Sequence, residues 1–420
     1  MKTLFALTVF ILFLAYSQRV LGQAGVIDPT FDPGIGPQFG QSFPAIYAIT
    51  VQPDGRILVS GTFSNWNNSG RAFLVRLFPD GSVDPSFVST LTTPPSAITM
   101  QGEKILVDIP DLWRLNADGS IDNTFNVVGR DGRTQVAPDS SLIRAGTMPF
   151  SAYPYFARWS ANGVLDTNFN VNLGPSRLTR VYDFVIQPDG KIVLDGNFQE
   201  PRKFIARLEG NGSVDVNFVT APLMYPPSDL ELAPAGALFL SDYGQLYRLL
   251  PDGNIDTNFN FTGPGGASAS PMRTQPDGKV IVAFGTSMQA PHLMRLNTNG
   301  SVDSTFLAGF TNLNDYIQTM ALQPDGRVIV SGPFATVQGK PRNRIARLLG
   351  DAPVLNVGRS GSNLILSWPA AYTNAVLQAR PNAEAGTWQN VGTGVAISND
   401  LRTLTVPVSN TARYFRLARP

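Results

Sequence analysis

Arginine and aspartate recur at a fixed spacing along this chain, in pairs that could either hold a metal ion or join two strands. Six arginines each stand eight residues before an aspartate, and a seventh pair joins an arginine near residue 350 to an aspartate near the start. The pairs are Arg76 and Asp84, Arg114 and Asp122, Arg158 and Asp166, Arg207 and Asp215, Arg248 and Asp256, Arg295 and Asp303, and Arg347 and Asp28.

A calcium loop is one interpretation of this spacing. Asn116, Asp118, Gly119 and Asp122 match four positions of an acidic calcium-binding loop. The first ligand position is Arg114, however, and a cation cannot coordinate Ca²⁺. We therefore expect each pair to be a structural ion pair across a hairpin, with no metal and no cofactor, and keep the calcium loop as the alternative.

Other catalytic patterns find little support. The chain has no cysteine, which excludes a thiol nucleophile and a thiolate metal site, and its one histidine, His292, has no recognisable partners for a Ser-His-Asp arrangement. Seven carboxylates outside the repeat pattern are candidates: Asp108, Asp111, Asp183, Asp195, Glu231, Asp242 and Asp315. We predict no catalytic residue.

Asp183 is the most informative of these carboxylates. It stands in the first strand of its repeat, where other copies have Ala48 or Thr319, so it is expected to face a central channel. A second carboxylate at a suitable distance would allow glycoside hydrolysis. The sequence does not identify that partner.

Aromatic side chains beside amides form a second candidate site. Trp66 next to Asn67, together with Tyr153 and Tyr155, could stack on a sugar or a peptide. The alternative is that these rings pack over the ends of the sheets.

The elements that must position these residues are repeats. An aliphatic residue, Asp, any two residues and Phe occur seven times, with successive Phe residues 38 to 56 positions apart. This period is typical of a four-stranded propeller blade. Within residues 46–87, Pro53-Asp54-Gly55 and Pro79-Asp80-Gly81 predict hairpin turns, because Pro sets φ and Gly accepts a positive φ.

The number of repeats predicts a closed ring. There are seven first turns and seven Asp-x-x-Phe segments, but the first Asp-x-x-Phe segment precedes the first turn and none follows the last turn. The N-terminal segment is therefore expected to complete the last blade. The fold prediction is all-β: a seven-bladed β-propeller over residues 23–351, closed by the N-terminal strand, with each Phe between blades. The second turn of each blade and the connections between blades vary, and their rim is the expected functional face.

A resemblance follows from three segments. Residues 299–306, 323–332 and 339–348 resemble the delta-60 repeat of bacterial β-propellers, and the likeness covers about residues 25–350. The resemblance implies a secreted or surface propeller of unknown ligand and supplies no catalytic residues.

The two ends of the chain differ from the repeats. Residues 1–22 have one lysine and a short apolar run, which predict a secretory signal peptide and a location outside the cell, at its surface or in the periplasm. Residues 352–420 predict a small β-sandwich similar to fibronectin type III or immunoglobulin-like modules, with strands at 364–368, 375–379, 388–391, 403–408 and 414–417 around Trp368.

Composition and repeats together favour a binding protein. With 32 basic and 31 acidic residues, no net field attracts nucleic acid, and no apolar run after the signal peptide is long enough to span a membrane. We expect an exported, monomeric, non-enzymatic binding, adhesion or scaffold protein whose ligand is a protein or a carbohydrate. The alternative is a propeller glycosidase or lyase acting on polysaccharide.

Overall fold

The computed structural model describes most of the chain between residues 24 and 418. The residues described are 24–40, 44–125, 127, 132–146, 156–169, 171, 180–198, 203–220, 223, 225–242, 245–261, 263, 269–284, 293–308, 310, 316–351, 355–370, 375–381, 387–391, 394–398, 401–407 and 413–418. The predicted signal peptide, Tyr153, Tyr155, His292 and Asp315 lie outside them. In the described part, no helix has the length and hydropathy of a membrane span.

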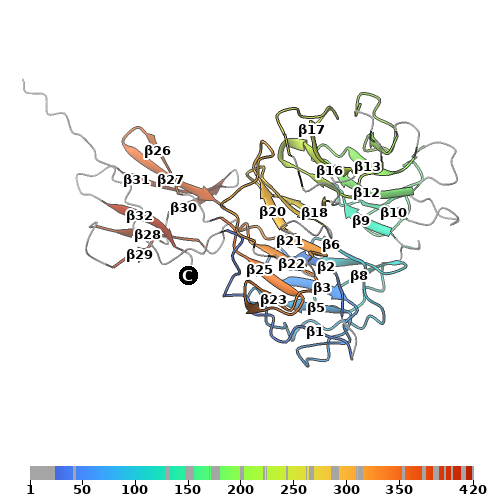
Figure 1. Cartoon of the computed structure of the whole chain (residues 1–420), viewed down its shortest axis with the longest axis horizontal. Coiled ribbons are helices and arrows are strands. Elements are labelled where there is room, and N and C mark those ends of the chain that lie inside the picture. The colour runs from blue at the N-terminus through green and yellow to red at the C-terminus, as the bar shows by residue number, and fades with distance from the viewer. Residues whose placement is uncertain are drawn as a thin grey trace, which may run out of the picture.

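Seven three-stranded antiparallel sheets follow one another between residues 46 and 348 (Figure 1), and are numbered here in chain order. Sheet 1 holds β2 (Ile46–Val51), β3 (Ile57–Gly61) and β5 (Leu74–Leu77); sheet 2, β6 (Ala97–Gln101), β7 (Lys104–Asp108) and β8 (Leu112–Leu115); sheet 3, β9 (Gly132–Val136), β10 (Leu142–Gly146) and β11 (Phe156–Trp159); sheet 4, β12 (Arg180–Ile186), β13 (Ile192–Asn197) and β14 (Ile205–Leu208); sheet 5, β15 (Leu230–Leu232), β16 (Leu238–Asp242) and β17 (Gln245–Leu249); sheet 6, β18 (Ala269–Thr274), β19 (Val280–Phe284) and β20 (Leu293–Leu296); sheet 7, β21 (Thr319–Leu322), β22 (Val328–Ser331) and β25 (Ile345–Leu348).

The first hairpin of each sheet follows from its turn residues. In sheet 1, Gly55 has a φ of 84° and donates its N–H to the Gln52 carbonyl at 2.9 Å, while the Asp54 carboxylate accepts the N–H of Arg56 at 2.9 Å. Only glycine adopts this φ without strain, which fixes the turn and the register after it. In sheet 5, where the triplet has become Pro-Ala-Gly, the turn is a short 3₁₀ element, η1 (Pro234–Gly236).

The Asp-x-x-Phe motif does not form the full fourth strand that the repeat predicts. In sheet 1, one bridge between Leu77 and Val83 joins it to the third strand. The Asp84 carboxylate then accepts the Ser86 N–H at 2.9 Å and bends the chain into a turn. Six equivalent bridges recur: Leu115 with Ile121, Trp159 with Leu165, Leu208 with Val214, Leu249 with Ile255, Leu296 with Val302, and Leu348 with Ile27.

The last of these bridges joins the N-terminal segment to sheet 7. The Gly25 N–H donates to the Leu349 carbonyl, and the Leu349 N–H donates to the Val26 carbonyl, both at 2.8 Å. The Asp28 N–H donates to the Arg347 carbonyl at the same distance. These bonds pair the start of the described chain with the end of the last sheet.

The same segment then crosses to sheet 1. Strand β1 (Pro37–Gln38) pairs with β4 (Asn65–Trp66), a strand in the loop between β3 and β5. In sheet 7 the corresponding loop forms a two-stranded hairpin of β23 (Thr336–Val337) and β24 (Lys340–Pro341). From that loop, the Gln338 amide accepts the Ile27 N–H at 2.9 Å and donates to the Gly25 carbonyl at 3.0 Å.

First strands of neighbouring sheets lie side by side in a circular order. The contacts run from β2 to β6, β9, β12, β15, β18 and β21, and from β21 back to β2, so the blue and orange segments of Figure 1 meet. Apolar side chains fill the junctions. Phe31, Ile46 and Trp66 pack with Ile329 and Ile345 in one buried cluster that joins sheet 7 to sheet 1.

After β25 the chain forms a separate pair of sheets, which Figure 1 shows beside the seven sheets. One sheet has the order β26 (Asn356–Ser360), β27 (Asn363–Pro369), β31 (Leu401–Pro407), β30 (Val395–Ser398); the other has the order β29 (Gln389–Asn390), β28 (Val376–Arg380), β32 (Tyr414–Ala418). Their core contains Leu366, Trp368, Leu377, Leu404 and Val406. Strands β26 and β30, the two edge strands of the first of these sheets, were not predicted.

Candidate functional site

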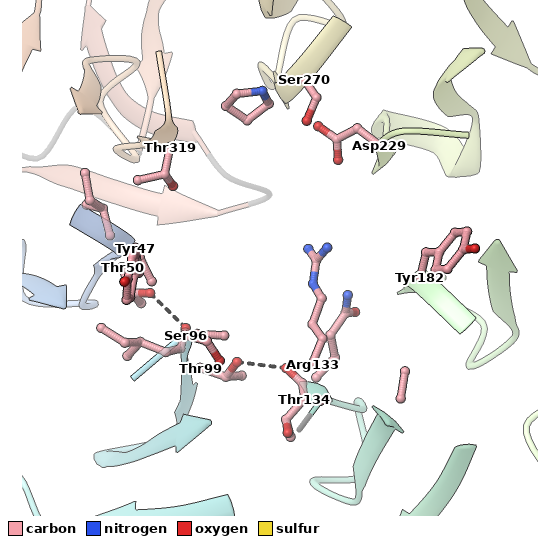
Figure 2. Close-up of a pocket in the computed structure, with 18 of the residues that line it drawn as sticks. Tyr47, Thr50, Ser96, Thr99, Arg133, Thr134, Tyr182, Asp229, Ser270 and Thr319 are labelled. Atoms are coloured by element: carbon pink, nitrogen blue, oxygen red, sulfur yellow. Dashed lines mark hydrogen bonds between the residues drawn. The ribbon is translucent and has the colours of Figure 1, made fainter. Parts of the chain in front are cut away.

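A cavity of about 750 Å³ lies where the first strands of the seven sheets converge. Its lining comes from these strands, including Thr50 of β2, Thr99 of β6, Arg133 of β9 and Thr319 of β21 (Figure 2). We call it the axial cavity.

Two tyrosines reach the axial cavity because of β-bulges. The pairing of β2 with β3 shifts between Ile46 and Ala48, which leaves Tyr47 as the extra residue. The pairing of β12 with β13 shifts at the equivalent place and leaves Tyr182. A bulge turns a side chain out of the regular alternation, and these side chains are 42% and 48% exposed. Figure 2 shows them on opposite sides of the cavity.

Arg133 extends into the middle of the same cavity. Its guanidinium forms an ion pair through Nη1 with Oδ2 of Asp183, and 42% of its side chain is accessible because it faces the cavity and not packed protein. In the repeat, Arg133 stands where Ala48 and Thr319 stand in other sheets. Arg133 was not selected as a site residue from the sequence. An arginine at a position of small residues was the signal that could have identified it.

Asp183 does lie at the axis, but it is buried and paired. Its neighbour across the ladder is Asp195, whose Oδ1 accepts the Asp183 N–H at 2.8 Å. Burial raises the pKa of the Asp183 carboxyl to about 6, against the lowering effect of Arg133, and the charge of Asp229 adds to the rise. Burial and the charge of Asp183 hold the pKa of Asp195 well above its usual value.

The remaining carboxylates near the axis accept hydrogen bonds from neighbouring strands. Asp229 accepts the Met272 N–H at 2.8 Å, which links sheet 5 to sheet 6. Glu231 accepts the Thr274 N–H at 2.9 Å and lies 3.6 Å from Arg273, while burial raises its pKa. These bonds assign both acids a role in positioning strands.

Asp108 forms a third such contact, between sheets 2 and 3. It accepts the Thr134 hydroxyl at 2.8 Å and lies 3.3 Å from Arg144. Burial raises its pKa to about 6, although Arg144 opposes the rise. We call Asp108, Asp183, Asp195, Asp229 and Glu231 the axial acids, and they act as buried or half-buried hydrogen-bond acceptors. The groups most open to a ligand are Tyr47, Tyr182 and Arg133.

Trp66 and Asn67 hold the N-terminal segment, and Asn67 is partly exposed. The Trp66 ring is fully buried and contacts Phe63 edge to face, with ring centroids 5.2 Å apart. The Asn67 side chain accepts the Gly36 N–H and donates to the Pro33 carbonyl, both at 2.7 Å. The Trp66 ring is therefore packed within the sheet end, and the Asn67 side chain bonds to the N-terminal segment.

Each repeated arginine lies against its aspartate. The distance from arginine Nε to aspartate Oδ2 is 2.7 to 2.9 Å in all seven pairs, including Arg347 and Asp28. The other carboxylate oxygen accepts the backbone N–H two residues later. In each pair, both carboxylate oxygens thus accept a hydrogen bond.

The repeated arginines also make two contacts that the spacing did not reveal. Each guanidinium lies over the ring of the Phe in its motif, with the carbon Cζ 4.4 to 5.3 Å from the ring centroid. Six of them also donate from Nη1 to the outer turn of the next sheet, and Arg295 donates to a residue that follows β25. The acceptors are the carbonyls of Ala117, Ala161, Gly210, Pro251, Thr298 and Pro79 and, for Arg295, the carboxylate of Asp351.

These contacts make the arginines links between sheets. The guanidinium of Arg347, in sheet 7, reaches Pro79 in sheet 1. Burial alone would raise the pKa of the Asp28 carboxyl, but the charge of Arg347 and the hydrogen bonds from Thr30 outweigh burial and lower that pKa. The aspartate is thus ionised and paired across the junction.

We expect the stability of the protein to fall between pH 5 and pH 7.5 because of the axial acids. Asp108 and Asp183 have pKa values of about 6 in the fold and about 3.9 when unfolded, so the folded state binds the extra proton. Their stabilising effect is complete below pH ~4 and is lost as the pH rises through about 6, each group contributing on the order of 1 to 3 kcal/mol. Urea unfolding at both pH values measures the loss.

The matched variants are Asp183→Asn, which removes one of these groups, and Asp277→Asn, which removes an exposed turn carboxylate. Asp183→Asn should flatten the pH dependence, and Asp277→Asn should leave it as in the parent. Equal pH dependence in the two variants would show that Asp183 does not titrate in this range.

The repeats match a family model. Five segments, residues 52–87, 110–125, 187–218, 275–306 and 323–351, match the family described as a domain of unknown function (DUF5122) beta-propeller. The matched segments leave out sheets 3 and 5, whose first turns have drifted from Pro-Asp-Gly. No curated protein matches the chain.

Solved structures share the fold at low sequence identity. Two are extracellular domains from B. thetaiotaomicron, described as parts of a hybrid two component system and of a one component system, with TM-scores of 0.55 and 0.54 and identities of 11% and 10%. They cover 94% and 90% of this chain, which spans about half (47%) of each of them. Virginiamycin B lyase from Staphylococcus aureus has a TM-score of 0.54 and 13% identity over 73% of this chain and 95% of its own. The chain is therefore an all-β protein that resembles β-propellers.

Proposed function

We propose that this protein is an exported, non-enzymatic binding protein: a seven-bladed β-propeller that takes its ligand at the axial cavity on the variable rim. The observation that carries the proposal is the pair of bulged, exposed tyrosines on opposite sides of a cavity that also contains Arg133. Concave sites with a few convergent polar groups are the usual location of ligand binding.

Seven sheets in circular contact support the seven-bladed ring. Sheet 7 contacts sheet 1 through β21 and β2, and the N-terminal segment bridges to Leu348 at the same junction. That segment serves as the outer element of the last blade, as Asp-x-x-Phe does in the others.

Export is supported by two independent observations. Residues 1–22 have the composition of a signal peptide. Two of the structures with a similar fold are extracellular domains of bacterial proteins. The protein then acts outside the cell, at its surface or in the periplasm, as a monomer without nucleic-acid partners.

The C-terminal pair of sheets serves as an accessory module. Two antiparallel sheets around a buried Trp368 support a fibronectin type III or immunoglobulin-like sandwich. Its own core separates its stability from that of the ring, as expected of a spacer or adhesion module.

A polysaccharide glycosidase or lyase is the second candidate, favoured by the raised pKa of Asp183 and Asp195. Asp183 forms an ion pair with Arg133, and Asp229 accepts the N–H of Met272. Both Asp183 and Asp229 are therefore engaged in contacts within the fold. The binding role therefore fits the geometry better.

The test of the binding role is a thermal-shift screen of the full chain against saccharides, peptides and amino acids. A ligand at about 100 times its Kd adds about 2.7 kcal/mol of stability, which raises Tm. The rise should disappear in the double variant Tyr47→Ala/Tyr182→Ala and persist in Trp113→Ala, which removes an exposed aromatic on β8 away from the cavity. If the ligand still raises the Tm of the double variant, the ligand binds outside the axial cavity.

A further inference from the structure

Given the binding role proposed above, we infer that the axial cavity takes a short neutral oligosaccharide or the end of a longer neutral chain. Its volume of about 750 Å³ falls within the range of ~300 to 1,000 Å³ typical of small-molecule sites. Four features of the lining, taken in turn below, select this class of ligand.

The two tyrosines provide flat apolar faces on opposite walls. Tyr47 and Tyr182 belong to sheets 1 and 4, which lie across the circular order from each other. A sugar ring has apolar C–H faces and a polar edge, and a tyrosine likewise combines an apolar ring with a polar hydroxyl. A saccharide between these walls can stack on either ring.

Each arginine of the cavity lies beside an acid. Arg133 pairs with Asp183, Arg273 lies 3.6 Å from Glu231, and Asp229 adds a further acid. Among the described residues, no unpaired positive charge is left to attract a sulfated, phosphorylated or uronic-acid ligand. This distribution disfavours an anionic ligand.

Arg133 supplies directed hydrogen-bond donors. Asp183 holds one edge of the guanidinium through Nη1, and among the described residues no other group bonds to its remaining N–H groups. A guanidinium has five donors in a fixed planar fork, so a held Arg133 can donate to two neighbouring hydroxyls of a sugar. Figure 2 shows this side chain between the two tyrosines.

The bulges disfavour an extended peptide. A peptide would add to the inner strands by regular backbone pairing, and the ladders are interrupted at Tyr47, at Tyr182 and between Ala269 and Met272. Pro271, which lines the cavity, has no N–H to offer. Side-chain recognition of a saccharide requires no such ladder.

The test is calorimetric titration of the full chain with maltotriose, cellotriose, xylotriose and triacetylchitotriose as neutral probes. Trigalacturonate serves as the anionic probe and a mixture of uncharged hexapeptides as the peptide probe. We expect at least one neutral trisaccharide to bind, with about tenfold weaker affinity in Tyr182→Ala and recovery in Tyr182→Phe. Arg133→Gln should also weaken binding, and Trp113→Ala should match the parent.

The outcomes separate the ligand class from the site. Tyr182-dependent binding of trigalacturonate or hexapeptides without any neutral sugar would overturn the neutral saccharide and leave the binding role of the cavity standing. Sugar binding that is unchanged in Tyr47→Ala/Tyr182→Ala would overturn both. The neutral saccharide is also overturned if none of the probes binds.

Discussion

Deletion of residues 24–34 should abolish cooperative folding of the ring or lower its Tm by more than any single substitution. The segment supplies Asp28 to Arg347, the backbone partners of Leu349, and the fully buried ring of Phe31 between sheets 7 and 1. Its loss leaves the last blade with an unpaired edge and exposes an apolar junction, which promotes association.

Thermal melts and size exclusion of two truncations measure this effect. Removal of residues 353–420 is the matched control, because the C-terminal sheets have a core of their own and Asp351 is retained. The control should melt close to the parent and remain monomeric. An N-terminal deletion that is as stable and monomeric as the parent would refute both the closure and the count of seven blades.

Replacement of Arg347 by alanine should lower the free energy of unfolding by about 2 to 3 kcal/mol, less than for a buried charge left unpaired, because Arg327 remains 3.1 Å from Asp28. The side chains of Arg347 and Asp28 are 2% and 1% exposed. The change removes the Asp28 pair, the contact over Phe31 and the bond to the Pro79 carbonyl at once. Urea unfolding at pH 7 provides the measurement.

Arg158→Ala is the internal comparison for this prediction. Arg158 makes the same three contacts, but it and Asp166 are 23% and 24% exposed, so solvent can replace part of what is lost. We expect a clearly smaller effect there, and an intermediate one for Arg347→Lys, which keeps the charge without the planar fork. Equal losses at Arg347 and Arg158 would contradict a role for burial.

The sequence predicted the repeat well because its signals are local. The positive φ of Gly55 and the pairing of Arg76 with Asp84 both follow from residues within one repeat. The fourth strand was overestimated, since alternation in residues 82–87 does not show that the Asp84 carboxylate ends the pairing after one bridge. A side chain that binds its own backbone competes with the ladder.

The candidate site was harder to predict because it depends on register. Asp183 stood out as an acid at a position of small residues, and the structure places it at the axis but beneath Arg133. Tyr47 and Tyr182 face the cavity only because one residue is inserted into each ladder, and a bulge leaves no local signature in these sequences. Arg133 was missed because it lies in sheet 3, whose first turn no longer has the Pro-Asp-Gly sequence. The repeats are hardest to align in that sheet.

One link in the circle of arginines differs from the other six. Arg295 does not donate to a backbone carbonyl of the next outer turn; it grips the Asp351 carboxylate with two bonds, of 2.7 and 2.9 Å. Asp351 is where the chain departs for the C-terminal sheets. A pulling force applied through those sheets would therefore act on the Arg295–Asp351 ion pair before it acted on the hydrogen bonds of β25. Arg295 would then be the first residue of the seven sheets to resist that force.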